Sequence, residues 1–333
     1  MTDGANRIKL ELKAAPLIVA HYLIGAGIPS EIYWPNKFER LGLDGKNSRL
    51  TPEHVEQLGW IKRQYEALKK NSETAAFAPH VLPLMARVDL AFSADKSQLA
   101  AVIGPLMALK LAYFKHLADS LTAVCGYTTV KQKVKLNKST GPLVTDRSRL
   151  RVISFVPTNE LELGFNKFYG LSDLSWANAY EAWADQSYDF KEETTRQAIK
   201  SRFNISYQLE GILEPQLLNE SLSSRIVDVL TGQSPTTAHG YNLPDALNDG
   251  GMMERCFDYS YKLFGSLQKK TAHLAPLACL WGHRQRYLLS VGYTETINLH
   301  KTTSGRPAKL AAAVVRRLAE KHPILHEELG QRG

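Results

Sequence analysis

Two stretches of the sequence resemble each other. Residues 260–291 read SYKLFGSLQKKTAHLAPLACLWGHRQRYLLSV, and residues 64–94 read QYEALKKNSETAAFAPHVLPLMARVDLAFSA. An offset of 197 positions (271 minus 74) aligns six identical residues: Thr74 with Thr271, Ala75 with Ala272, Ala78 with Ala275, Pro79 with Pro276, Arg87 with Arg284 and Ser93 with Ser290. Each stretch predicts an amphipathic helix, a short Ala-Pro turn and an apolar run. An internal duplication and a chance similarity both stay open.

The length and composition predict a globular protein of two domains. The chain has 333 residues, of which 44% are hydrophobic and 22% charged. Domains typically span about 100 to 200 residues, so this length suits two. The cysteines (Cys125, Cys256 and Cys279) form no paired spacing, which favours a reducing compartment. The N-terminus lacks the order of a signal peptide, and no run approaches the roughly 18 apolar residues of a membrane span, so we expect a cytoplasmic protein without a membrane partner.

Helices dominate the predicted elements. Thr51-Pro52 predicts a capped helix start, and a longer helical stretch over 97–122 is bent or interrupted at Pro105. Residues 149–157 predict a central strand, whereas 209–232 and 244–267 have a helical pattern. The fold class expected is therefore α/β or α+β, rich in helix.

The chain is basic. Its formal net charge is +8 and its pI is about 9.2, which suggests a nucleotide, a nucleic acid or another phosphate ligand as partner. A mildly basic protein without such a partner is the alternative. Cations are concentrated between residues 128 and 151, at Lys131, Lys133, Lys135, Lys138, Arg147 and Arg149. The alternating lysines would share one face of a strand, suited either to nucleic-acid phosphates or to protecting a sheet edge.

A second basic cluster lies near the C-terminus. It consists of His283, Arg284, Arg286, Lys301 and Arg306. Such groups can hold a phosphate through charge-assisted hydrogen bonds, and a solvated basic surface is the alternative. The sequence holds no zinc-protease motif, nucleophile elbow or phosphate-binding loop, so it predicts neither a catalytic residue nor a metal ligand.

The C-terminal region resembles the C-terminal half of the flavin-dependent thymidylate synthases. The resemblance rests on the following residues: Leu277-Ala278, Thr294-Glu295, Leu299, Lys301-Thr302-Thr303 and Gly305-Arg306-Pro307. Lys301 falls where this family has a nucleotide-binding arginine. Because residues 64–94 fit the same segment, the chain resembles two degenerate copies in tandem. The resemblance implies FAD as cofactor and a pyrimidine nucleotide or base as substrate.

The departures from this family lie in its signature, which is Arg-His-Arg followed by spaced Ser, Asn-Glu, Ser and Arg-Tyr. In the first half Gly25-Ala26-Gly27 replaces the three basic residues, and only Ser30 matches. The second half keeps Lys200, Arg202 and, with a slip of one residue, Ser206. The sequence HRQRY at 283–287 repeats the signature's residues at another place and spacing. These losses imply a member with lost or altered catalysis.

Two hypotheses follow from these patterns. The first is a divergent thymidylate synthase-like protein in which Lys200, Arg202, Ser206, His283 and Arg284 bind the cofactor, while Arg286, Lys301 and Arg306 bind the substrate phosphate. The second is a non-catalytic nucleic-acid-binding or assembly subunit that uses the lysine strand and the C-terminal helix. The expected domains are 1–136 and 149–333, joined by residues 137–148 and packed as a pseudo-dimer or forming a homo-oligomer.

Overall fold

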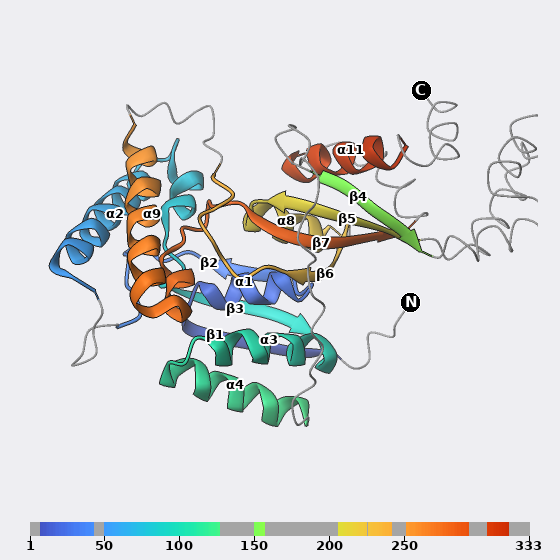
Figure 1. Ribbon diagram of the computed structural model, residues 1–333, viewed down its shortest axis with the longest axis horizontal. Coiled ribbons are helices and arrows are strands. Elements are labelled where there is room, and N and C mark those ends of the chain that lie inside the picture. The colour runs from blue at the N-terminus through green and yellow to red at the C-terminus, as the bar shows by residue number, and fades with distance from the viewer. Residues whose placement is uncertain are drawn as a thin grey trace, which may run out of the picture. The chain divides into compact units, whose positions relative to one another are not determined.

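The computed structural model describes residues 7–42, 50–126, 150–156, 206–224, 226–241, 251–292 and 305–319. They form a mixed α/β fold with antiparallel sheets, as the coarse prediction had it (Figure 1). The chain divides into two compact units: unit 1 holds 1–138, 212–223 and 229–287, and unit 2 holds 139–211, 224–228 and 288–333. The predicted linker at 137–148 lies outside the described residues.

Unit 1 contains a three-stranded sheet in the order β1-β3-β2. The strands are β1 (Ile8–Pro16), β2 (Ser30–Tyr33) and β3 (Arg87–Ala94), and both pairings are antiparallel. Every second residue of β3 is buried, beginning at Val88, because successive side chains of a strand point to opposite faces. One face of this sheet therefore belongs to the core and the other is largely open.

The helix α1 (Ile18–Gly25) follows β1 directly. All of its residues from Ile18 to Ile24 are buried. Because it is apolar on every side, this helix shows no 3.6-residue pattern in the sequence. The next helix, α2 (Pro52–Lys70), begins where Thr51-Pro52 predicted: the Thr51 hydroxyl accepts from the His54 N–H, and the His54 ring accepts from the Thr51 N–H.

The predicted interruption within 97–122 lies elsewhere. Pro105 sits inside α3 (Lys96–Ala108), and the chain breaks before α4 (Ala112–Cys125). Lys110, at the break, has a φ of 53°, a left-handed conformation that no helix continues through. Proline near the end of a helix removes one hydrogen bond without ending it, so the prediction was wrong in its position.

The second sheet has the order β4-β5-β7-β6. Its strands are β4 (Leu150–Val156), β5 (Ser206–Leu213), β6 (Asp228–Gly232) and β7 (Gln285–Gly292). The strand predicted at 149–157 is confirmed as β4. The helix predicted over 209–232 is wrong: β5, α8 (Pro215–Ser223) and β6 occupy it. Closely spaced leucines and isoleucines ran through all three elements and concealed the breaks between them. In unit 2, α11 (Gly305–Ala319) packs on β4.

Two series of elements, one in each half of the chain, follow the same order. The series β1, α1, β2, α2, η2 (Ala75–Val81) and β3 is matched by β5, α8, β6, α9 (Met252–Thr271), η3 (Ala272–Ala278) and β7. Matching elements begin 197 to 200 residues apart, and the matching strands occupy the same order within their sheets. In unit 1, α2 and α9 lie side by side (Figure 1), and the rings of Trp60 and Tyr259 meet edge to face.

Candidate functional site

Three of the predicted site residues lie together where η3 leads into β7. They are His283, Arg284 and Arg286. His283 is buried, and its Nδ1 accepts a hydrogen bond of 3.0 Å from the Leu280 N–H. Its ring packs edge to face on Phe257 at 4.9 Å. Burial lowers the pKa of His283 to about 4, so the imidazole is neutral near pH 7 and supplies packing instead of positive charge.

The two arginines lie on one face of the chain. Arg284 directly precedes β7 and Arg286 lies within it, and both are partly exposed. Buried residues alternate with them, which directs the two side chains to the same side. The Arg284 N–H donates to the Gly240 carbonyl at 2.9 Å, and the Arg286 carbonyl accepts from the Gln233 N–H at 2.9 Å. The backbone of this basic face is therefore fixed by residues 233–240.

Gln285, between the arginines, holds the same loop from the buried side. Its Oε1 accepts from the Thr236 N–H at 3.0 Å, and its Nε2 donates to the Thr236 carbonyl at 2.9 Å. At the end of the loop Tyr241 stacks on Phe257, with ring centroids 3.8 Å apart and planes 8° from parallel. Gly240 has a φ of +67°, and a Cβ there would lie 3.1 Å from the Arg284 guanidinium. The loop and the arginines thus form one compact arrangement, which we call the β7 cluster (residues 233–241 and 283–287).

A buried polar pair joins Tyr287 of the β7 cluster to His21 of α1. The His21 ring lies 6.1 Å from that of Tyr287, and its Nε2 is 3.3 Å from the Gln233 carbonyl. Among the described residues, neither His21 Nδ1 nor the Tyr287 hydroxyl has a hydrogen-bond partner. Burial lowers the pKa of His21 to about 4 and raises that of Tyr287. His21 stands in an apolar stretch of sequence, whereas Tyr287 directly follows the basic residues of β7.

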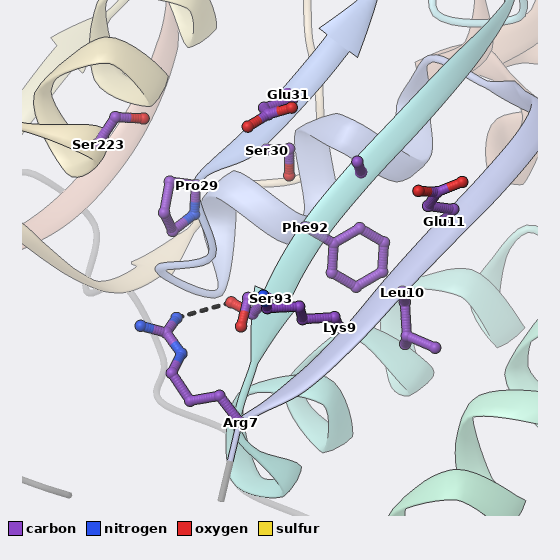
Figure 2. A pocket seen from close by; sticks show the side chains of 11 residues that line it. Arg7, Lys9, Leu10, Glu11, Pro29, Ser30, Glu31, Phe92, Ser93 and Ser223 are labelled. Carbon is purple, nitrogen blue, oxygen red and sulfur yellow. Dashed lines mark hydrogen bonds between the residues drawn. The ribbon is translucent and has the colours of Figure 1, made fainter. Parts of the chain in front are cut away.

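A pocket of about 690 Å³ opens in unit 1 at β1, β2 and β3 (Figure 2). Its lining is mixed in charge: Arg7, Lys9, Leu10, Glu11, Pro29, Ser30, Glu31, Ala91, Phe92, Ser93 and Ser223. Arg7 donates to the Ser93 carbonyl at 2.6 Å, across the rim. No predicted site residue lines this pocket. The alternation of charged residues at 9, 11 and 13 was the signal that could have located this open sheet face.

The other predicted residues are less fully placed. Ser206 is the first residue of β5 and pairs with Val156, and Arg306 lies in the first turn of α11. The remainder fall outside the described residues: Lys131, Lys133, Lys135, Lys138, Arg147, Arg149, Lys200, Arg202 and Lys301. The described residues thus gather His283, Arg284 and Arg286 in one cluster.

Metal ligation and membrane insertion find no candidate in the part of the chain that the structure describes. There, no three His, Cys, Asp or Glu side chains are grouped to hold a metal ion. Within the same residues, no helix combines the length and the apolar character needed to cross a bilayer. No protein-family model matches the sequence, and neither curated proteins nor solved structures give a match to it.

Proposed function

We propose that this chain is a divergent relative of the flavin-dependent thymidylate synthases that binds a pyrimidine nucleotide or base, with FAD as its cofactor and with lost or altered catalysis. The observation that carries the proposal is the β7 cluster. It presents Arg284 and Arg286 on one face, inside the segment that resembles this family.

The spacing of the arginines suits a phosphate group. Alternate residues of a strand are about 6.6 Å apart, close enough for two long guanidinium side chains to converge on one anion. Guanidinium groups bind phosphate by paired, charge-assisted hydrogen bonds. The neutral imidazole of His283 leaves the binding charge to the arginines. It fixes the turn that leads into them through its bond to the Leu280 N–H.

We further infer that residues 8–94 and 206–292 are two copies of one ancestral unit, called here the first and second repeat. The matching order of elements supports this, together with the identical residues at Thr74 and Thr271, Ala78 and Ala275, and Pro79 and Pro276. In both repeats a helix is followed by a 3₁₀ helix and then by a strand, and the two 3₁₀ helices are 197 positions apart. A pseudo-dimer within one chain is the corresponding assembly.

Titration with FAD and with deoxyuridine monophosphate tests the proposed function. Absorbance between 300 and 550 nm reports flavin binding, and calorimetry reports the nucleotide. Replacing both Arg284 and Arg286 by Ala should weaken nucleotide binding at least tenfold, since a hydrogen bond to a charged group contributes about 1.5–3 kcal/mol.

The control for this titration is Arg63→Ala, an exposed arginine on α2 that should leave the affinity unchanged. A wild-type protein that binds neither ligand would overturn the proposal. Equal affinities for the wild type and the double variant would remove the β7 cluster from it.

A nucleic-acid-binding or assembly subunit is the second candidate, and the net charge of +8 favours it. The test is binding of a single-stranded or duplex oligonucleotide at increasing salt concentration. Affinity that falls steeply with salt would favour this candidate, provided that the salt dependence becomes weaker when Lys131, Lys133 and Lys135 are replaced by Ala. The same oligonucleotide binding without salt dependence would exclude it.

A further inference from the structure

A buried histidine–carboxylate pair joins η2 to the residue before α8 in unit 1. His80 Nε2 lies 3.7 Å from Glu214 Oε2, and the two side chains are 3% and 5% exposed. The other ring nitrogen of His80 is 3.2 Å from the Phe77 carbonyl, which orients Nε2 toward the carboxylate. His80 belongs to the first repeat and Glu214 to the second.

The backbone around this pair is symmetric under the offset of the repeats. Trp281 N–H donates to the Leu82 carbonyl at 2.8 Å, and its counterpart, Leu84 N–H, donates to the Cys279 carbonyl at 2.8 Å. Gly282 N–H donates to the His80 carbonyl at 2.9 Å, and Met85 N–H to the Leu277 carbonyl at 3.1 Å. Each bond maps onto the other when 197 is added to or subtracted from its residue numbers. At the centre, Pro83 and Leu280, themselves 197 positions apart, form an antiparallel bridge.

The side chains at the same place break this symmetry. The offset of 197 positions that relates Ala75 to Ala272 places His80 on Leu277 and Glu214 on Leu17. Leu17 and Leu277 are both fully buried. One side of the pseudo-twofold axis thus carries two ionisable groups, and the equivalent positions on the other side are apolar.

We propose that the His80–Glu214 pair selects the partner of each repeat, so that a first repeat packs with a second repeat and rejects another copy of itself. This rests on the duplication proposed above. Two first repeats packed in the same way would set His80 against Leu17, and two second repeats would set Glu214 against Leu277. Either arrangement buries an ionisable group against a leucine, which is strongly unfavourable, whereas the mixed arrangement matches both sides. The interface therefore distinguishes two halves whose backbones are alike.

Moving the pair to the symmetric position tests this. Leu17→Glu places a carboxylate opposite Leu277 and should remove the folded protein at its native size, giving unfolded or self-associated chains. Leu17→Glu combined with Leu277→His recreates the pair on the other side. This double variant should elute at the native volume, and its denaturation midpoint should return most of the way to the wild-type value. Leu23→Glu with Leu277→His is the matched control, since Leu23 is equally buried but lies elsewhere on α1, and it should show no rescue.

Size-exclusion chromatography with light scattering and chemical denaturation give the readout. A Leu17→Glu protein of native size and stability would overturn the proposal, as would a double variant no better folded than Leu17→Glu or rescue in the Leu23 control. None of these measurements depends on nucleotide or flavin, so a failure here is separate from a failure of the proposed binding function.

Discussion

At the scale of single residues, the core of unit 1 contains several buried ionisable side chains. His21 and His283 are each 2% exposed, and burial lowers both pKa values from 6.5 to about 4. His80 faces Glu214 at 3.7 Å inside the same core. Each of these side chains is tied to a backbone carbonyl or amide, so they fix local conformation as well as fill space.

The stability of the protein should fall as the pH decreases from 6.5 to 4. In this window the unfolded chain binds protons at His21 and His283 while the folded chain does not. The free energy of unfolding therefore rises with pH, and the contribution of the two histidines reaches its full value above pH 6.5. Each histidine contributes up to about 3 kcal/mol. Urea denaturation at pH 7 and pH 4.5 measures the difference.

Replacing His283 by Gln should reduce this dependence on pH, because glutamine does not titrate. His116→Gln is the control, since His116 lies exposed on α4 and its replacement should leave the slope unchanged. A His283→Gln protein with the wild-type slope would show that this ring is not kept neutral by the fold.

Replacing His80 by Leu should destabilise the protein by about 3 kcal/mol, because a buried carboxylate loses its imidazole partner. The denaturation midpoint measures this loss. Lys62→Leu, which breaks the partly exposed Lys62–Glu66 pair on α2, should change stability by less than about 1 kcal/mol. Equal effects of the two variants would contradict the buried role of His80.

At the scale of elements, the sequence predicted those parts whose pattern is local. The start of α2 at Thr51-Pro52 and the strand β4 are confirmed because capping and a continuous apolar run are short-range signals. The segment 209–232 was mistaken for helix because packing against other elements, and not local propensity, separates β5, α8 and β6. Of the site, the basic side chains of the β7 cluster were visible in the sequence. Gln285 was not, because its role depends on a partner 49 residues away. Tyr287 stands beside these basic residues in the sequence, but its burial against the His21 ring follows only from the fold.

Gln285→Leu should loosen the loop 233–241 from β7. The change removes both hydrogen bonds to Thr236 and leaves its partly buried N–H and carbonyl without them, at a cost of about 2 kcal/mol. Hydrogen exchange should show faster exchange of the Thr236 amide, and affinity for the nucleotide should fall although no arginine has changed. Unchanged protection of that amide would mean that the loop is held by other contacts.

At the scale of the whole molecule, the sequence suggested a repeat through six identical residues but could not give its extent. Strand β1 and strand β5 share little sequence, yet each opens a series of elements in the same order. On the duplication proposed above, the matching positions Leu17 and Glu214 differ even in chemical character, which sequence comparison cannot align. The proposal therefore rests on the order of the elements and on the paired backbone hydrogen bonds more than on identical residues.

The bridge between Pro83 and Leu280 joins two segments that are synthesised at different times. Residues next to it, such as Leu82 and Leu84, are fully buried in the finished protein, and their hydrogen-bond partners lie at Cys279 and Trp281. At about 5–20 residues per second, synthesis of the intervening chain takes about 10 to 40 s. Throughout that interval the nascent N-terminal part carries an apolar surface whose natural cover has not been translated. This part of the core can therefore close only after the residues around Leu280 have been synthesised.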